Sequence, residues 1–387
     1  MEQQPRMNNF DQVRLFGAIL VIYGHAYALS GFPSPGFAVN AVGTVGVKIF
    51  FSISGYLIAL SWLSDPNIGR FMLRRLLRLI PALAVVVLLS ALVMGPLLTT
   101  LSFKQYFSNP LTYFYLKNIA LYINYSLPGL FENNVYPGAV NGSLWSLPAE
   151  FAMYLLTPVL IGIAGLIAGR TAFAVIGGIF IAVAYWATSI LPQFRLVVYA
   201  TDVWSWLSVA PYFVMGMLYA VCRLDRFFNI YVGAAGLFAL AIFETNVAVK
   251  EAALLLILPY FSLSFGTGFA PVLRKLTRGA DLSYGLFLYG FPIEQILKLE
   301  LGSLVGPWKT FVLATVISAG FAFVSWHFVE KPTLAWKPRR KRESTEIHPQ
   351  SIDLPLATAS LERLERFPAN GSRQCAPDHR LRGYRSA

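Results

Sequence analysis

The chain has 387 residues, of which 56% are hydrophobic and only 13% are charged, and its formal net charge is +12. Soluble domains average roughly 25% charged residues, so this composition excludes an ordinary soluble enzyme. It predicts an all-α protein that crosses a membrane about ten times, because a helical span needs about 20 apolar residues. The positive charge does not indicate a nucleic-acid partner, since it lies in short loops and in the final segment rather than on a soluble basic domain.

Ten apolar runs mark the expected membrane spans. With the N-terminus in the cytoplasm, the inward loops before residue 333 carry twelve Lys and Arg residues, and the outward segments carry six. This excess is the usual orientation signal of membrane proteins, so both termini are expected on the cytoplasmic side. The runs cover residues 15–31, 42–63, 79–98, 144–168, 171–191, 204–222, 229–243, 252–270, 282–297 and 308–328.

Two segments lie outside these runs. Residues 99–143 form the one long outward connection, in which the apolar stretch 111–123 is too short for a span and suits an interfacial helix. Residues 333–387 contain eleven Lys and Arg residues against six acidic ones. This predicts a basic, disordered cytoplasmic tail that contacts anionic membrane lipid and follows a membrane domain at residues 1–332. Two cysteines without metal-ligand neighbours predict neither a disulfide framework nor a metal site.

The first expected span carries three titratable residues, Asp11, Arg14 and His25. The eleven-residue separation of Arg14 and His25 is close to three helical turns, so the two share one helix face and lie about 16 Å apart along the axis. Asp11 lies three residues before Arg14 and can pair with it. Arg14 therefore lies at the inner membrane boundary and His25 near the middle of the bilayer. A histidine inside the membrane is a candidate for proton-transfer chemistry. The simpler alternative is a histidine bonded to a neighbouring helix for packing.

A basic cluster of Arg74, Arg75 and Arg78 enters the third expected span from the cytoplasmic side. The spacing places these side chains on one helix surface, and guanidinium groups match phosphate oxygens well. The cluster is therefore a candidate phosphate-binding site. The alternative is that these arginines only fix the orientation of the helix, with their positive charges on the cytoplasmic side, and bind no ligand.

Glu150 and Lys48 are charged residues inside expected spans. A carboxylate at that depth must be protonated or paired, and Arg14, His25 and Lys48 are all candidate partners of Glu150. A purely structural ion pair is the alternative to a catalytic role. A Ser-Gly pair shortly after Lys48 would permit close contact between two helices.

Six short motifs follow one another along residues 8–333. They are Phe10-Asp11-x-x-Arg14 with His25, Gly46-Val-Lys-Ile-Phe50-Phe51-x-x-Ser54-Gly55-Tyr56, Arg74-Arg75-x-x-Arg78-x-x-Pro81, Ser143-Leu-Trp145-Ser146-Leu-x-x-Glu150, Ser283-Tyr284-Gly-Leu-Phe287-Leu-Tyr289 and Phe328-Val-Glu330-Lys331-Pro332. In this order they resemble the acyltransferase 3 family. Its members are inner-membrane proteins that move acyl groups, most often acetyl from acetyl-CoA, onto sugars of exported glycans. The resemblance therefore implies a bacterial inner-membrane location.

The resemblance also implies roles for particular residues. His25 would be the central catalytic residue with Arg14 as its partner on the same helix, and Arg75 and Arg78 would hold the phosphates of acetyl-CoA or another acyl-CoA, with Arg74 in support. A carbohydrate hydroxyl would be the acceptor. The imidazole would act either as a general base or as a nucleophile that first takes the acyl group. The carboxylate at position 150 would orient it or bias its protonation.

Aromatic residues of the outward segment 99–143 are candidates for stacking on the acceptor sugar. Anchoring at the membrane interface explains such residues equally well. The tyrosines concerned are Tyr106, Tyr113, Tyr115, Tyr122, Tyr125 and Tyr136.

The sequence departs from the family pattern at two positions. Gly290 stands where many members have a second histidine, and His327 is the nearest substitute. Lys48 stands where many members have an acidic residue. A rival hypothesis from another class is a carrier or flippase for a glycolipid or a small solute, because charged groups inside spans also serve transport.

Overall fold

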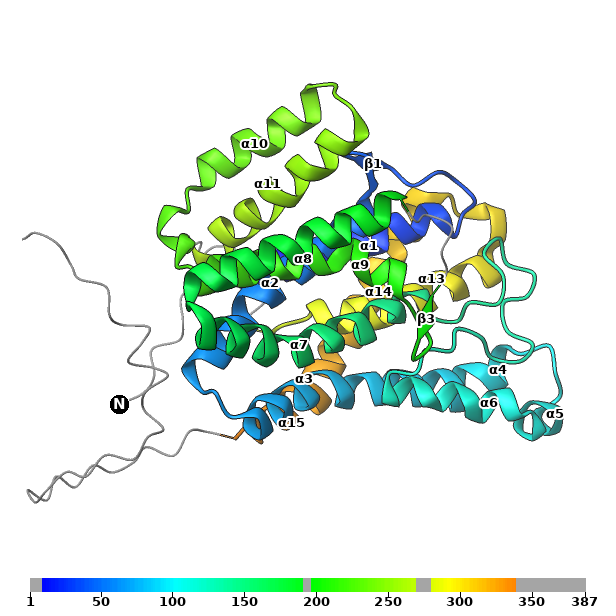
Figure 1. Ribbon diagram of the computed structural model, residues 1–387. Coiled ribbons are helices and arrows are strands. Elements are labelled where there is room, and N and C mark those ends of the chain that lie inside the picture. Colours follow the sequence, from blue (N-terminus) through cyan, green and yellow to red (C-terminus); the bar gives the residue numbers. More distant parts are fainter. Residues whose placement is uncertain (1–8, 191–195, 269–279, 339–387) are drawn as a thin grey trace, which may run out of the picture. The chain divides into compact units, whose positions relative to one another are not determined.

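A computed structural model describes residues 9–190, 196–268 and 280–338 of the chain. In these ranges the fold is helical apart from two antiparallel pairs of two-residue strands, β1 (Gly36–Phe37) with β2 (Asn40–Ala41), and β3 (Val197–Val198) with β4 (Thr201–Asp202). The predicted all-α class is confirmed. The longer helices (Figure 1) are α1 (Phe10–Ala28), α2 (Val42–Ser64), α3 (Ile68–Leu89), α7 (Ser146–Ile167), α8 (Arg170–Ile190), α9 (Val203–Val221), α10 (Ile230–Ile242), α11 (Val247–Thr267), α13 (Ser283–Leu301) and α14 (Pro307–Ser325).

Seven helical segments of the described ranges are long and apolar enough to cross a membrane. They coincide with seven of the predicted runs. The other three runs are also helical, but α10 has only 13 residues and both α1 and α13 carry charged side chains. Crossing by these three helices therefore remains a prediction. The seven segments are Val42–Ser64, Ile68–Leu98, Gly142–Ile167, Arg170–Ser189, Val203–Val221, Val247–Thr267 and Pro307–Ala335.

The segment 99–143 contains only short helices, α5 (Phe103–Ser108), α6 (Pro110–Phe114) and the 3-10 turn η2 (Tyr115–Ala120). None of them is long enough to cross a bilayer as a helix, which supports the prediction that the stretch 111–123 is not a span.

Two other predictions meet the limits of the described ranges. The last candidate span ends with the short helix α15 (Lys331–Ala335), and the predicted basic tail from residue 339 onwards lies outside the described residues. The same holds for the basic loop at 274–278.

Contacts at both ends of α1 and α13 show that these two helices run in the same direction. Near the start of α1, Nη1 of Arg14 lies 3.9 Å from Oδ2 of Asp281, which lies two residues before α13. Near the end of α1, Nδ1 of His25 lies 3.9 Å from Oε2 of Glu294. Moving along α1 from the first contact to the second therefore means moving forward along α13 as well.

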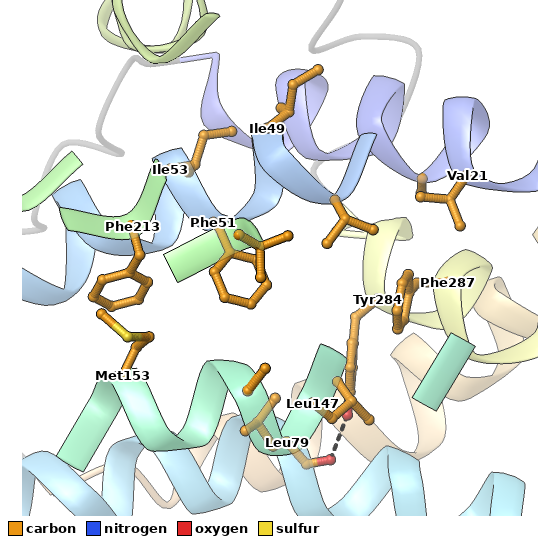
Figure 2. Packing of buried hydrophobic residues seen from close by; sticks show 14 of the residues in the cluster. Val21, Ile49, Phe51, Ile53, Leu79, Leu147, Met153, Phe213, Tyr284 and Phe287 are labelled. Carbon is orange, nitrogen blue, oxygen red and sulfur yellow. Dashed lines mark hydrogen bonds between the residues drawn. The ribbon is translucent and has the colours of Figure 1, made fainter. Parts of the chain in front are cut away.

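The core lies where α2, α3, α7, α9 and α13 meet (Figure 2). Phe51 of α2 and Phe213 of α9 stack edge to face with ring centroids 6.4 Å apart, and Met153 of α7 lies beside Phe213. Across the core, the hydroxyl of Tyr284 donates a hydrogen bond of 2.8 Å to the carbonyl of Leu79, which ties α13 to α3.

Helices α2 and α9 approach each other closely at Gly55. A Cβ atom at this position would overlap the backbone carbonyl of Phe213, and one at Gly216 of α9 would overlap the carbonyl of Ser52. The helices pack at this distance because neither glycine has a side chain. The close helix contact predicted from the Ser-Gly pair is confirmed.

We expect Gly55→Ala to lower the stability of the protein by about 1–3 kcal/mol, because the added methyl group forces the two backbones apart. Gly178→Ala on α8 is the matched control: nothing lies within 4 Å of a Cβ there, and alanine favours the helix. Thermal unfolding in detergent measures both variants. Equal melting temperatures for the two variants would contradict the packing account.

Candidate functional site

A cavity of about 310 Å³ lies between α1, α2, α3, α7 and the start of α13. It brings together four of the six site residues predicted from the sequence, Arg14, Arg75, Arg78 and Glu150. We call it the basic cavity. The charged side chains that line it are Arg14, Arg75, Arg78, Lys337, Asp11, Glu150 and Asp281.

Two carboxylates hold Arg78 in place. Its Nη2 donates to Oδ2 of Asp281, and its Nη1 lies 3.7 Å from Oε2 of Glu330 in the π-helical turn η6 (Trp326–Glu330). Burial alone would raise the pKa of Asp281, but the positive charges of Arg78 and Arg14 outweigh burial and lower this pKa to about 2. Asp281 is therefore a buried anion that positions two arginines.

The predicted pairing of Asp11 with Arg14 is present, at 3.7 Å. Arg14 thus lies between two carboxylates, since Oδ2 of Asp281 is 3.9 Å away on its other side. These contacts fix the start of α1 against the basic cavity.

Arg75 differs from its neighbours because no described carboxylate lies within ion-pair distance of it. Its Nη2 donates to Oγ of Ser61 at 3.0 Å, and its guanidinium lies over the ring of Phe71. Its Nε is buried without a hydrogen-bond partner. A buried donor without a partner is costly; Arg74 also has two such nitrogens, but of the two residues only Arg75 lines the basic cavity.

Lys337 adds a fourth cation to the cavity. Burial and the positive charges of Arg78, Arg75, Arg14 and Arg74 lower the pKa of Lys337 to about 8. Burial is the larger cause of this shift, and the repulsion from the four arginines adds to it. From the sequence, Lys337 was assigned to the predicted tail. It is the first residue of a short basic run, and nothing in that run indicates that this residue, unlike those after it, reaches the cavity.

Glu150 lies in the basic cavity rather than beside His25. Its Oε1 accepts hydrogen bonds from the hydroxyls of Ser54, at 2.7 Å, and Tyr154, at 2.6 Å. Arg14 lines the same cavity. Of the three candidate partners of Glu150, the structure therefore brings only Arg14 to the same site.

Lys48 has other partners. Its Nζ donates to Oδ1 of Asn40 at 2.6 Å and to Oε2 of Glu251 at 3.2 Å. The buried cation at position 48 is thus neutralised by α11 and does not compensate Glu150.

Arg74 does not line the basic cavity. Its Nη1 donates to Oδ2 of Asp65 at 2.9 Å. Asp65 also accepts two hydrogen bonds from Arg70. Asp65, Arg70 and Arg74 together join the loop between α2 and α3 to the first turns of α3. Arg74 therefore stabilises this loop instead of lining the cavity.

His25 lies outside the basic cavity, close to the end of α1. Its ring contacts Phe291 edge to face at 5.1 Å, and its Nδ1 is buried without a hydrogen-bond partner. Glu294 faces this nitrogen and is fully buried, and neither of its oxygens has a hydrogen-bond partner. The structure therefore pairs His25 with Glu294.

Glu294 was missed in the sequence, although a signal for it exists. It is an ionisable residue inside the expected span 282–297, and the rule that drew attention to Glu150 applies to it equally. The family resemblance in the sequence instead drew attention to Gly290. A Cβ atom at this position would come too close to the side chain of Ile22 in α1. His327 is exposed on η6 and its Nδ1 bonds to the carbonyl of Phe323.

Comparison with known proteins identifies the family. The sequence matches the acyltransferase domain over residues 7–327, so the chain belongs to the acyltransferase 3 family and is a multi-pass membrane protein. It is 29% identical over 334 residues to an O-acetyl transferase of Shigella phage Sf6. This alignment covers 84% of the present chain and 96% of the phage protein. It is 28% identical over 355 residues to Nodulation protein 10 of Rhizobium leguminosarum bv. viciae, covering 84% and 93% of the two chains. No solved structure matches the chain.

We expect Asp281→Asn to destabilise the protein by about 3 kcal/mol at neutral pH, because it leaves two partly buried arginines short of a buried carboxylate. Since the pKa of Asp281 is depressed to about 2, this contribution is present above about pH 4 and disappears as the pH falls towards 2. Denaturant titration in detergent at pH 7 and at pH 3 measures the loss.

Glu244→Gln is the control for this prediction. Glu244 forms an ion pair with Lys250, but its side chain is 90% exposed, and exposed ion pairs contribute little to stability. If both variants were equally stable, Asp281 would not be the anchor of the site.

Proposed function

We propose that the protein is an O-acetyltransferase of the bacterial inner membrane that moves an acetyl group from cytoplasmic acetyl-CoA to a hydroxyl of an exported or cell-surface glycan. The observation that carries the proposal is the arrangement along α1: the basic cavity lies at its beginning, and His25 with Glu294 lies near its end. Membership of an acyltransferase family favours an enzyme over a carrier or flippase. The relative from phage Sf6 is itself an O-acetyl transferase.

We further propose ten spans with both termini in the cytoplasm. In this topology the first and ninth spans, α1 and α13, cross in the same direction because seven spans separate them. The parallel contacts Arg14 to Asp281 and His25 to Glu294 support it. An additional span within 99–143 would make α13 antiparallel to α1. The excess of inward Lys and Arg residues then orients the basic cavity towards the cytoplasm.

The basic cavity would hold the phosphates of acetyl-CoA. Arg75 and Lys337 would make the first contacts, because Arg14 and Arg78 already bind carboxylates. Guanidinium groups donate paired hydrogen bonds to phosphate oxygens. The uncharged pantetheine arm would then extend along α1, over the about 16 Å that eleven helical residues span, and bring the thioester to His25.

At the thioester, His25 would act as the general base. A carboxylate beside Nδ1 favours the tautomer with its proton on that nitrogen, which leaves Nε2 free to accept one. Glu294, once deprotonated, would supply this carboxylate after a shift of about 1 Å from the present 3.9 Å, since a hydrogen bond needs roughly 2.9 Å. The imidazole takes the proton of the sugar hydroxyl, the oxygen attacks the thioester carbonyl, and CoA leaves as a thiolate that receives the proton.

The donor site is tested with Arg75→Gln. We expect this variant to bind CoA about tenfold more weakly by isothermal titration, because one charge-assisted contact to phosphate is lost. Arg70→Gln is the matched control: Arg70 lies on the same helix but pairs with Asp65, away from the cavity. Unchanged affinity of the Arg75 variant would refute the phosphate-binding role.

The catalytic centre is tested with His25→Ala. We expect at least about a 100-fold loss of acetyl transfer, the usual effect of removing a general base, with the affinity for CoA unchanged. His327→Ala controls for the loss of a histidine, because that side chain is exposed on η6. Transfer of radiolabel from acetyl-CoA to glycan in isolated membranes measures both. Activity near that of the unmodified protein after loss of His25 would exclude its catalytic role.

A further inference from the structure

A second cavity, of about 470 Å³, is lined in part by Tyr136 and Ala139, whose carbonyls accept hydrogen bonds from Gln295 of α13. Its lining comes from the segment 125–145 and from the β4 strand with the first turn of α9. We call it the aromatic cleft. The side chains that give it its chemical character are Tyr125, Tyr136, Trp145, Thr201, Asp202 and Ser205.

The chemistry of the aromatic cleft differs from that of the basic cavity. It combines three aromatic rings with hydroxyls and one carboxylate, and its lining includes no Lys or Arg. A polyanion such as CoA would find no counter-charge there. A sugar ring has apolar C–H faces that stack on aromatic rings and hydroxyls that exchange hydrogen bonds with Asp, Ser and Thr. The volume falls in the usual range of ligand sites.

The loop that forms one wall of the cleft is fixed to α13. The side-chain amide of Gln295 donates to the carbonyls of Tyr136, at 2.8 Å, and Ala139, at 2.7 Å. Asn134 donates in turn to the backbone and side-chain oxygens of Gln295. Gln295 is fully buried and directly follows Glu294. The wall of the cleft and the partner of His25 are therefore held by adjacent residues of one helix.

A single ring separates the cleft from His25. Phe291 is buried, and it stands edge to face with Tyr136, at 6.1 Å, and with His25, at 5.1 Å. It also packs directly on Gly142, where a Cβ would overlap its ring. Phe291 thus connects Tyr136 of the cleft with the imidazole of His25.

We propose that the aromatic cleft binds a sugar unit of the acceptor, with Tyr136 and Trp145 stacking on the ring and its reacting hydroxyl directed past Phe291 to His25. This assignment rests on the proposed function for its chemistry. It also distinguishes four of the six tyrosines of 99–143 from one another. Tyr106 and Tyr115 are fully buried and serve packing, whereas Tyr125 and Tyr136 are 37% and 49% exposed and face the cleft.

The test uses the full chain in isolated membranes with radiolabelled acetyl-CoA and, as acceptor, oligosaccharides released from the surface polysaccharide of the host cells. We expect Tyr136→Ala and Trp145→Ala each to raise the KM for the oligosaccharide about tenfold, as for aromatic residues at the centre of a binding site. The affinity of both variants for CoA should stay within about twofold of that of the unmodified protein. Trp145→Phe should retain transfer because it keeps an aromatic ring.

Tyr113→Ala is the matched control, since Tyr113 is 54% exposed on the same segment but does not line the cleft. An equal rise in KM for this control, or an unchanged KM for Tyr136→Ala, would overturn the proposal. Binding is measured separately from acetyl transfer, by the change in tryptophan fluorescence when the oligosaccharide is added. The contribution of Trp145 is the difference between the change in the unmodified protein and the change in Trp145→Phe. Oligosaccharide binding without any acetyl transfer would uphold the cleft and refute the proposed function. Transfer without a fluorescence change would refute the cleft alone.

Discussion

The buried ion cluster of Arg78, Asp281 and Glu330 is the constraint on which the site depends. Its members come from α3, from the residue pair before α13 and from the turn after α14. Charges buried at this depth are tolerated only when they are paired, so these elements must meet in one arrangement. Because Asp281 also lies 3.9 Å from Arg14, the same carboxylate sets the position of α1 and therefore of His25.

The arrangement separates two kinds of chemistry along one rigid helix. Cations that attract phosphate gather at the beginning of α1, while the end of α1 carries an imidazole beside a buried carboxylate. A helix keeps a fixed rise per residue, so in the proposed function α1 would set the distance between donor binding and acyl transfer. The parallel packing of α13 repeats this order, with Asp281 at one end and Glu294 at the other.

Local patterns in the sequence predicted local features well. The apolar runs predicted the helices, the spacing of Asp11 and Arg14 predicted their ion pair, and the small pair ending at Gly55 predicted a close helix contact. Each of these depends on residues near one another in the chain. The basic motif of α3 was also recognised, but not its division into Arg75 and Arg78 at the cavity and Arg74 beside Asp65.

The contacts that assemble the site join residues far apart in the chain, and these were not predicted. Arg78 and Asp281 are 203 residues apart, and Lys48 and Glu251 are also separated by 203. Which carboxylate reaches which cation depends on how the helices pack, and a single sequence does not encode this as a local pattern. The pairing of His25 with Glu294 rather than Glu150 has the same origin.

The central claim is that acetyl-CoA is bound at the cytoplasmic face and that the acetyl group is delivered to a glycan on the other face. Sealed membrane vesicles of opposite orientation test it directly, because the charged donor does not cross the bilayer. The account predicts that radiolabelled acetyl-CoA added outside inside-out vesicles labels glycan in the lumen, and that right-side-out vesicles label glycan only after permeabilisation. Equal labelling by intact right-side-out vesicles would contradict the account, because the basic cavity would then face outward.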